Sequence, residues 1–230
     1  MEQFRAFNTL WMQVRKQTTF WDQVSLGGEI KSYEDFSRIP ELTKEHLKNE
    51  IERLTRRDVK VTNYITTGGS TGSPLKLPVG DESVSRVRSK QAEGRAEYGI
   101  KYRDRCFLIW GHSAAIGKGI RPVIEKWKRK LKDKLIGYYR LSAYELGVDT
   151  LQSKFEHFIQ FKPAWVCGYS SAVVAFARAN WQYKKRIGSL QLKAVLCSAE
   201  MLSAGEAKEL REFFCAPVAL QYGAMEFGPI

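Results

Sequence analysis

The sequence has no long apolar run, few histidines and no closely spaced cysteine pair. Its apolar stretches are short and interrupted by charged residues, so none is long enough to cross a membrane, and residues 1–5 lack the apolar core of a signal peptide. Three histidines and four cysteines without a Cys-x-x-Cys pattern argue against a zinc site and favour a reducing compartment. We therefore expect a cytoplasmic protein without a membrane span.

Repeats and Pro/Gly-rich linkers are also missing. The 230 residues are 43% hydrophobic and include six tryptophans, which is typical of a packed globular protein. We expect a helical segment over residues 1–60, packed on an α/β domain over residues 61–230. The cysteines lie on or beside apolar segments, so we expect them to be small hydrophobic side chains of the core. They are Cys106, Cys167, Cys197 and Cys215.

The 25 acidic residues are outnumbered by 37 lysines and arginines, and the formal net charge is +12. This excess would suit a nucleic acid, an anionic membrane surface or an anionic substrate. The densest basic block covers residues 126–134. Ile124, just before it, and Trp127 and Leu131, within it, recur at spacings of three and four, which favours an amphipathic helix with a solvated basic face. No aromatic ladder or nucleic-acid motif accompanies the charges, so we favour a solvated surface over nucleic-acid binding.

Strands and helices alternate along most of the chain. The expected strands cover residues 61–65, 75–79, 105–110, 134–141, 164–167, 192–198 and 218–222. The expected helices cover residues 3–24, 43–54, 120–134, 143–161, 170–186 and 204–214, with a long one beginning near Asp81 and a connector over 33–40. This alternation predicts an α/β fold with a largely parallel sheet flanked by helices, and ligands bind such sheets at the carboxyl ends of the strands.

Residues 66–76 form a loop rich in glycine and hydroxyl groups that follows the strand expected over 61–65. Glycines let backbone N–H groups approach an anion, and the hydroxyls of Thr67, Ser70 and Thr71 can donate to phosphate oxygens. The loop lacks the Gly-Lys-Ser/Thr ending of a Walker A sequence, which argues against an ordinary P-loop NTPase. It predicts a phosphate-binding loop, with a flexible linker as the alternative.

Five segments in a fixed order resemble the motifs of the adenylate-forming superfamily, in its phenylacetate-CoA ligase and CapK branch, which includes capsular polysaccharide proteins. They are residues 39–45, 66–76, 163–172, 192–200 and 221–226. The resemblance extends from about Tyr33 to the last motif. Ordered co-occurrence makes it more specific than any single motif. Three of the motifs follow strands that end at residues 65, 198 and 222, so in the expected parallel sheet we predict that these strand ends point toward one site.

The resemblance assigns the glycine-rich loop to the β- and γ-phosphates of ATP. The residues that it implies there are Thr67, Gly69, Ser70, Thr71 and Gly72. Two departures weaken this match: Gly68 replaces the usual Ser, and Ser73 stands where many relatives have Lys. The first removes a hydroxyl donor and the second removes a cation, so we expect a lower affinity for pyrophosphate than in the typical enzyme.

The adenine site implied by the resemblance comes from the next two motifs. Backbone groups of Ser198, Ala199 and Glu200 would contact the base, although a helix-entry loop, with Ser203 and Glu206 as a capping box, explains the same residues. Tyr222, followed by Gly223, would lie against the adenine ring, because an aromatic face stacks on a base. A core tyrosine is the alternative.

The resemblance also implies a metal and an acid site. Glu226 would ligate Mg²⁺, which prefers carboxylate and water oxygens, but Met225 replaces a Thr whose hydroxyl meets the phosphate, and a thioether cannot donate a hydrogen bond. The acid pocket is less marked. His112, in a glycine-rich segment, and Tyr169, at a strand end, are its candidates; an exposed loop histidine is the alternative for His112.

The reaction implied by the resemblance joins a small carboxylic acid to ATP, giving an acyl-adenylate and pyrophosphate, with later transfer to CoA or an amine. Catalysis would depend on positioning and on neutralising phosphate charge. We expect the chain to be the front part of such an enzyme, without its small C-terminal lid domain, and inactive alone. The alternatives are a non-catalytic nucleotide-binding remnant and a basic nucleic-acid-binding module. A homodimer is a candidate assembly.

Overall fold

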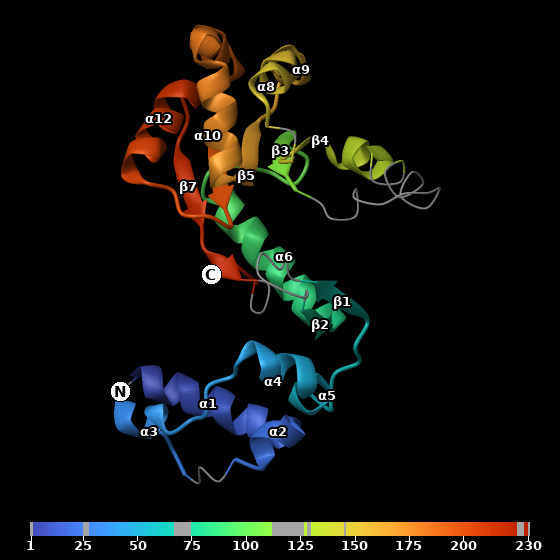
Figure 1. Ribbon diagram of the computed structural model, residues 1–230, viewed down its shortest axis with the longest axis vertical. Helices are drawn as coiled ribbons and strands as arrows, with labels where there is room; N and C mark the ends of the chain where they lie inside the picture. The colour runs from blue at the N-terminus through green and yellow to red at the C-terminus, as the bar shows by residue number, and fades with distance from the viewer. Residues whose placement is uncertain are drawn as a thin grey trace. The chain divides into compact units, whose positions relative to one another are not determined.

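The computed structural model describes residues 2–24, 28–66, 75–111, 127, 130–144, 146–224 and 228–229 (Figure 1). The chain divides into two compact units, Met1–Arg86 and Val87–Ile230. Helix α6 (Asp81–Ala96) contains the division. In the residues that the structure describes, no helix is both long and apolar enough to cross a membrane.

The first unit begins with short helices around an aromatic cluster. These are α1 (Glu2–Gln17), α2 (Thr19–Asp22), α3 (Tyr33–Ser37), α4 (Lys44–Asn49) and α5 (Ile51–Leu54). Trp11 and Trp21 are buried at the centre, with ring centroids 5.3 Å apart in an edge-to-face arrangement, and Ile30 completes the cluster. The aromatic stripe of the N-terminal segment is therefore used for packing.

Two helix predictions and one connector prediction in this unit are wrong in detail. The helix expected over residues 3–24 is broken at Thr18, whose hydroxyl accepts a hydrogen bond from the Trp21 N–H and caps α2. Such hydroxyls compete with helix continuation by bonding to nearby backbone groups. The helix expected over 43–54 is interrupted at Glu50. The expected connector contains α3, because Ser32 and Asp35 form a capping box there.

The strands around the glycine-rich loop form a separate sheet. β1 (Asn63–Thr66) and β2 (Lys76–Val79) are antiparallel, with Thr66 opposite Lys76. We expected the end of β1 to share a parallel sheet with the other motif-bearing strands, and this was wrong. β1 pairs instead with the next strand along the chain. Residues 67–75 are too few for the crossover of a dozen or more residues that a parallel connection needs, whereas an antiparallel pair needs only a loop.

The second unit is built on a five-stranded, wholly parallel sheet of order β4-β3-β5-β6-β7. Its strands are β3 (Cys106–Trp110), β4 (Tyr138–Ser142), β5 (Trp165–Tyr169), β6 (Ala194–Ser198) and β7 (Val218–Gln221). The predicted α/β fold with a largely parallel sheet and flanking helices is confirmed.

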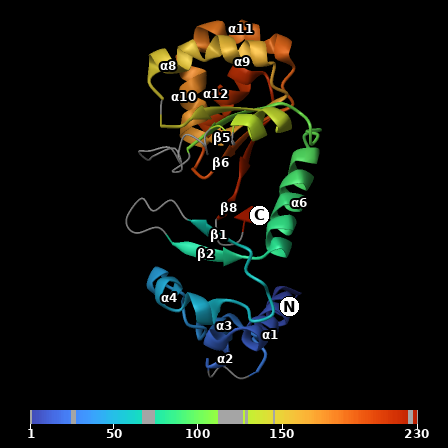
Figure 2. The same ribbon diagram turned by 90° about the vertical axis from the view of Figure 1, so that its right-hand side faces the viewer.

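Helices cover one face of this sheet, as Figure 2 shows. They are α8 (Val148–Ser153), α9 (Phe155–Phe161), α10 (Ser170–Ala179), α11 (Lys184–Ile187) and α12 (Ala204–Phe214). Phe107 of β3, Phe158 of α9 and Phe176 of α10 are fully buried at the centre of this layer. The helix expected over 143–161 is split at Lys154, and that expected over 170–186 ends early, whereas α12 has its predicted bounds and its predicted capping box.

The other face carries a smaller cluster around Trp165. The Arg95 guanidinium, from the end of α6, lies 4.9 Å from the Trp165 ring centroid, and the indole N–H of Trp165 donates to the Asp104 carbonyl. Lys193, just before β6, pairs with the Asp104 carboxylate at 2.6 Å. Because parallel sheets are normally covered on both faces, the end of α6 supplies part of this second layer.

The basic block does not bury its apolar residues as predicted. Residues 130–136 are helical, but Trp127 is 70% exposed and Leu131 is 62% exposed. Ile124 lies outside the described residues. The helix instead contacts the sheet through Asp133: its carboxylate is buried and accepts two hydrogen bonds from the Arg140 guanidinium of β4.

Three of the four cysteines are core residues, and the fourth is not. Cys106, Cys167 and Cys197 are buried in the sheet, whereas Cys215 is exposed after α12, contrary to our expectation. Burial raises the pKa of Cys106 well above its ordinary value, that of Cys167 to about 11 and that of Cys197 to about 12. The thiolate is the reactive form, so the three buried thiols are unreactive near neutral pH.

Thiol labelling checks this arrangement. At pH 8 the native protein should release one equivalent of thionitrobenzoate from Ellman's reagent, from Cys215, and four equivalents once it is unfolded. A Cys215→Ser variant should release almost none in the native state. Rapid labelling of a second cysteine in the native protein would show that the sheet interior is accessible to solvent.

Candidate functional site

Three predicted site segments lie side by side at the carboxyl edge of the parallel sheet. Tyr169, the last residue of β5, is the register partner of Ser198, the last residue of β6. Ser198 is in turn the partner of Gln221, the last residue of β7, and Tyr222 follows directly. The register therefore brings together Tyr169, the Ser198 turn and Tyr222, which are far apart in sequence.

The turn after β6 is tightly fixed. Ala199 has a φ of 66°, in the left-handed region. The Ser170 hydroxyl donates to the Glu200 carbonyl at 2.9 Å, and the Ser171 N–H donates to the Glu200 carboxylate at 2.9 Å. The turn is therefore joined to the start of α10. The helix-entry alternative for these residues is confirmed, because Ser203 and Glu206 form the capping box of α12.

Tyr222 lies on the surface at the end of β7, with 68% of its area exposed. It is not a core tyrosine, so one of the two alternatives for this residue is wrong. Gly223 begins β8 (Gly223–Ala224), which pairs antiparallel with β9 (Gly228–Pro229). The ring is thus free to offer an aromatic face beside the Ser198 turn.

A cluster of aromatic side chains lies at the carboxyl edge of the parallel sheet, next to the end of β5. Trp110, the last residue of β3, lies 4.4 Å from Tyr169 between ring centroids. Tyr144, just after β4, packs so closely on Gly111 that a Cβ there would come within 2.9 Å of its ring. Burial, followed by the proximity of Tyr144 and Glu200, raises the pKa of Tyr169. Sequence reasoning named neither Trp110 nor Tyr144 as a site residue: Trp110 is the last residue of the strand expected over 105–110, and Tyr144 falls in the helix expected over 143–161.

Several predicted site residues lie outside the described residues. They are the phosphate-loop residues Thr67, Gly69, Ser70, Thr71 and Gly72, with the departures Gly68 and Ser73, the acid-site candidate His112, and Met225 and Glu226 of the metal motif. Among the residues that are described, no cluster of three or more His, Cys, Asp and Glu side chains is arranged to hold a metal.

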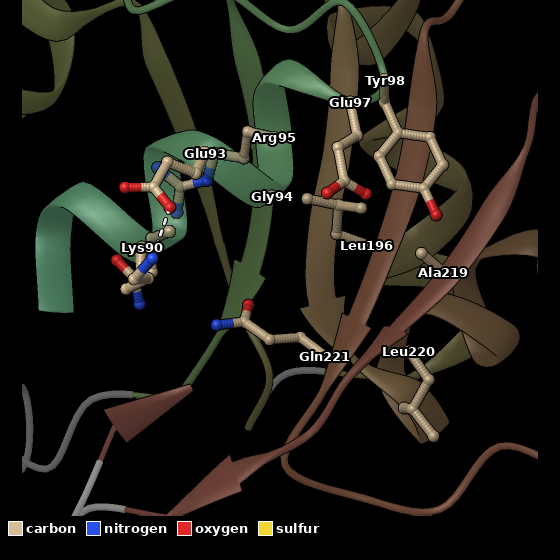
Figure 3. A pocket seen from close by; sticks show the side chains of 11 residues that line it. Lys90, Glu93, Gly94, Arg95, Glu97, Tyr98, Leu196, Ala219, Leu220 and Gln221 are labelled. Atoms are coloured by element: carbon tan, nitrogen blue, oxygen red, sulfur yellow. Dashed lines mark hydrogen bonds and ion pairs between the residues drawn. The ribbon is translucent and has the colours of Figure 1, made fainter. Parts of the chain in front are cut away.

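A groove of about 570 Å³ runs between α6 and strands β6 and β7 (Figure 3). Leu196, Ala219 and Leu220 line it from the sheet side, and charged residues of α6 line it opposite, with Lys90 and Glu93 paired at 2.7 Å. Gln221 is the point at which the groove reaches the strand ends, because it is the register partner of Ser198.

Comparison with known proteins agrees with the motif analysis. No family model matches the chain. Protein CapK of Staphylococcus aureus is 20% identical over an alignment 231 residues long, which covers 99% of this chain and 50% of that protein. An open 2-hydroxyisobutyryl-CoA ligase in complex with 2-HIB-AMP and CoA matches 96% of this chain and 48% of its own, with a TM-score of 0.65 and 17% identity. The same ligase in its thioesterification state matches 98% and 49%, with a TM-score of 0.65 and 18% identity.

The predicted resemblance to the adenylate-forming enzymes is therefore confirmed, both in the CapK relative and in the shared fold of the solved ligase. The chain spans about half the length of these proteins. At this level of identity the solved structures establish the fold, and the chemistry has to be argued from the residues of this chain.

Proposed function

We propose that the chain carries the nucleotide-binding part of an enzyme that activates a small carboxylic acid with ATP as an acyl-adenylate. One observation carries this proposal. The strand register aligns Tyr169, Ser198 and Gln221 at the carboxyl edge of a parallel sheet, where such folds bind ligands. The motifs that the resemblance assigns to adenine are those that flank this edge.

The residues at this edge fit a nucleotide base. Tyr222 has an exposed ring that can stack on adenine without sequence-specific hydrogen bonds. The turn at Ala199 presents backbone groups held in one orientation. In the proposal, the loop from Thr67 to Gly72 donates to the phosphates, and Glu226 holds Mg²⁺, which would neutralise phosphate charge when bound.

The acid would lie toward β5, beside Tyr169 and Trp110, with His112 as a candidate partner of its carboxylate. Trp110 and Tyr169 form an aromatic wall at the end of β3 and β5, which favours an apolar body on the acid over a strongly polar one. We further propose that the acyl group passes to CoA or an amine, and that the reaction serves capsular polysaccharide synthesis.

Titration calorimetry with ATP, in the presence and absence of Mg²⁺, tests the proposal. We expect saturable binding that is weak without Mg²⁺ and tighter with it, because a divalent cation screens the phosphate charge. A folded sample that gives no binding heat at millimolar Mg-ATP, together with strong salt-sensitive binding of RNA or DNA, would favour the basic nucleic-acid module instead.

Removal of the Tyr222 ring should weaken nucleotide binding. Tyr222→Ala is expected to cost about 1–3 kcal/mol of binding free energy, the range found when a base loses an aromatic stacking partner. Tyr222→Phe, which keeps the ring, should bind nearly as well as the native protein. Tyr102→Ala is the matched control, because Tyr102 is 89% exposed and precedes β3, at the amino ends of the strands. Equal affinities for the two alanine variants would remove Tyr222 from the site.

The metal assignment has its own test. Glu226→Gln keeps the side-chain shape and removes the charge, so it should abolish the gain in ATP affinity that Mg²⁺ provides and leave the affinity for free ATP unchanged. Its melting temperature should stay close to that of the native protein. Glu41→Gln, a change at an exposed carboxylate before α4, should preserve the Mg²⁺ dependence. A large drop in melting temperature for Glu226→Gln would identify a structural ion pair instead.

A further inference from the structure

The turn after β6 has an unfavourable backbone conformation that calls for an explanation. Ala199 lies in the left-handed region, with a φ of 66°, where a residue with a Cβ is crowded by the following carbonyl and glycine is preferred. Residues in such conformations persist only where the surrounding contacts fix them, and they gather at functional sites. The contacts of the neighbouring residue, Glu200, show how this turn is fixed.

Glu200 is held at two points by the start of α10. Its backbone carbonyl accepts a hydrogen bond from the Ser170 hydroxyl at 2.9 Å, and its carboxylate accepts one from the Ser171 N–H at 2.9 Å. Ser170 is buried, with 1% of its area exposed. Because both the backbone and the side chain of Glu200 are engaged, the turn before it cannot relax independently of α10.

The bond from Ser171 also completes the N-terminus of α10. The residue at the N-cap position, Tyr169, makes no capping hydrogen bond, and the first turn contains no acidic residue. The first N–H groups of a helix have no partner within the helix and carry partial positive charge. The Glu200 carboxylate therefore supplies from the end of β6 the cap that the sequence of α10 lacks.

We infer that Glu200 and Ser170 are positioning residues of the nucleotide site: they clamp the turn at Ala199 so that its backbone groups face the adenine. The inference rests on the proposed function and goes beyond it, because in it the Glu200 carboxylate binds the N-terminus of α10 and does not contact the nucleotide. Since Tyr169 and Ser198 are register partners, the clamp joins the ends of β5 and β6 into one rigid edge. Groups held in place before binding bind more tightly than groups that must be ordered.

The test measures the affinity for Mg-ATP of variants that open the clamp. Glu200→Ala should bind roughly tenfold more weakly than the native protein and Ser170→Ala several-fold more weakly, because binding must then order the turn. Glu200→Gln should recover part of the loss, since its amide oxygen can still accept from the Ser171 N–H. Glu206→Ala is the matched control: Glu206 completes the capping box of α12 with Ser203, so its loss should lower the melting temperature and leave the affinity within about twofold.

A variant at Ala199 separates positioning from stability. Ala199→Gly relieves the unfavourable φ and gives the turn more freedom, so its melting temperature should not fall while its affinity for Mg-ATP falls several-fold. A merely structural role would move the melting temperature and the affinity together in every variant.

The outcomes are distinguishable. If the native protein binds Mg-ATP, and Glu200→Ala and Ser170→Ala bind as tightly as Glu206→Ala, the clamp is overturned and the proposed function stands. Affinity losses that follow the melting temperature across all the variants would also overturn it. If the folded native protein does not bind Mg-ATP, the proposed function fails, and the clamp fails with it.

Discussion

Replacing Phe158 with alanine is expected to lower the free energy of unfolding by about 3–5 kcal/mol, the usual cost of removing a buried aromatic ring. The ring of Phe158 is fully buried on α9. Its centroid lies 4.9 Å from that of Phe107 on β3 and 5.4 Å from that of Phe176 on α10. Alanine would leave a cavity between the sheet and two helices, and neither layer can close it without breaking its own contacts.

Urea denaturation followed by circular dichroism measures this loss. Phe158→Leu should recover more than half of it, because leucine fills much of the same space. Tyr102→Ala, at a side chain that is 89% exposed, should change stability by less than about 0.5 kcal/mol. A loss below about 1 kcal/mol for Phe158→Ala would contradict the central place of this ring in the core.

Gly168→Ala should have the second largest effect, a loss of about 2–3 kcal/mol or more from overpacking. A Cβ at Gly168 would lie 2.7 Å from the Ile109 carbonyl oxygen of β3 and 2.8 Å from Cγ2 of Val173 in α10. The carbonyl belongs to a neighbouring strand and cannot move aside. The glycine in the motif at residues 163–172 is therefore required for packing, and its effect should appear in stability.

The same substitution at Gly94 provides a control of opposite sign. Gly94 is inside α6, and apart from its chain neighbours and the backbone of its own helix no atom lies within 4 Å of a Cβ built there. Because glycine disfavours a helix interior by about 0.5–1 kcal/mol relative to alanine, Gly94→Ala should stabilise the protein. Thermal melting of the two variants checks both signs. A Gly168→Ala variant as stable as the native protein would mean that β3 and α10 approach β5 less closely than described.

Local sequence was sufficient to predict the bounds of an element where the residues that end it are part of the element or next to it. α12 has its predicted bounds because Ser203 and Glu206 form the capping box that the sequence showed. The breaks at Thr18 and Lys154 were not predicted, since the apolar spacing continues across them. Where a helix must turn to keep covering a sheet or a cluster, tertiary packing decides its end, and periodicity alone cannot reveal it.

The candidate site was predictable where it depends on the order of the motifs along the chain. The motif order and the alternation of strands and helices placed Tyr169, Ser198 and Tyr222 at one sheet edge, and the register brings them together. The role of the Glu200 carboxylate was not predictable, because its partner Ser171 lies on another element, 29 residues away. The hairpin of β1 and β2 was misassigned because strand propensity does not reveal the direction of pairing.

Amide hydrogen exchange with and without Mg-ATP shows whether the carboxyl edge of the parallel sheet is the nucleotide site. We expect slower exchange with nucleotide at residues 198–200 and 222–224 and in the loop at 67–72. Exchange should be unchanged at residues 101–104, which precede β3 at the opposite edge. Protection confined to residues 101–104 or to the basic helix at 130–136, with none at 198–200 and 222–224 under saturating nucleotide, would show that the nucleotide binds elsewhere.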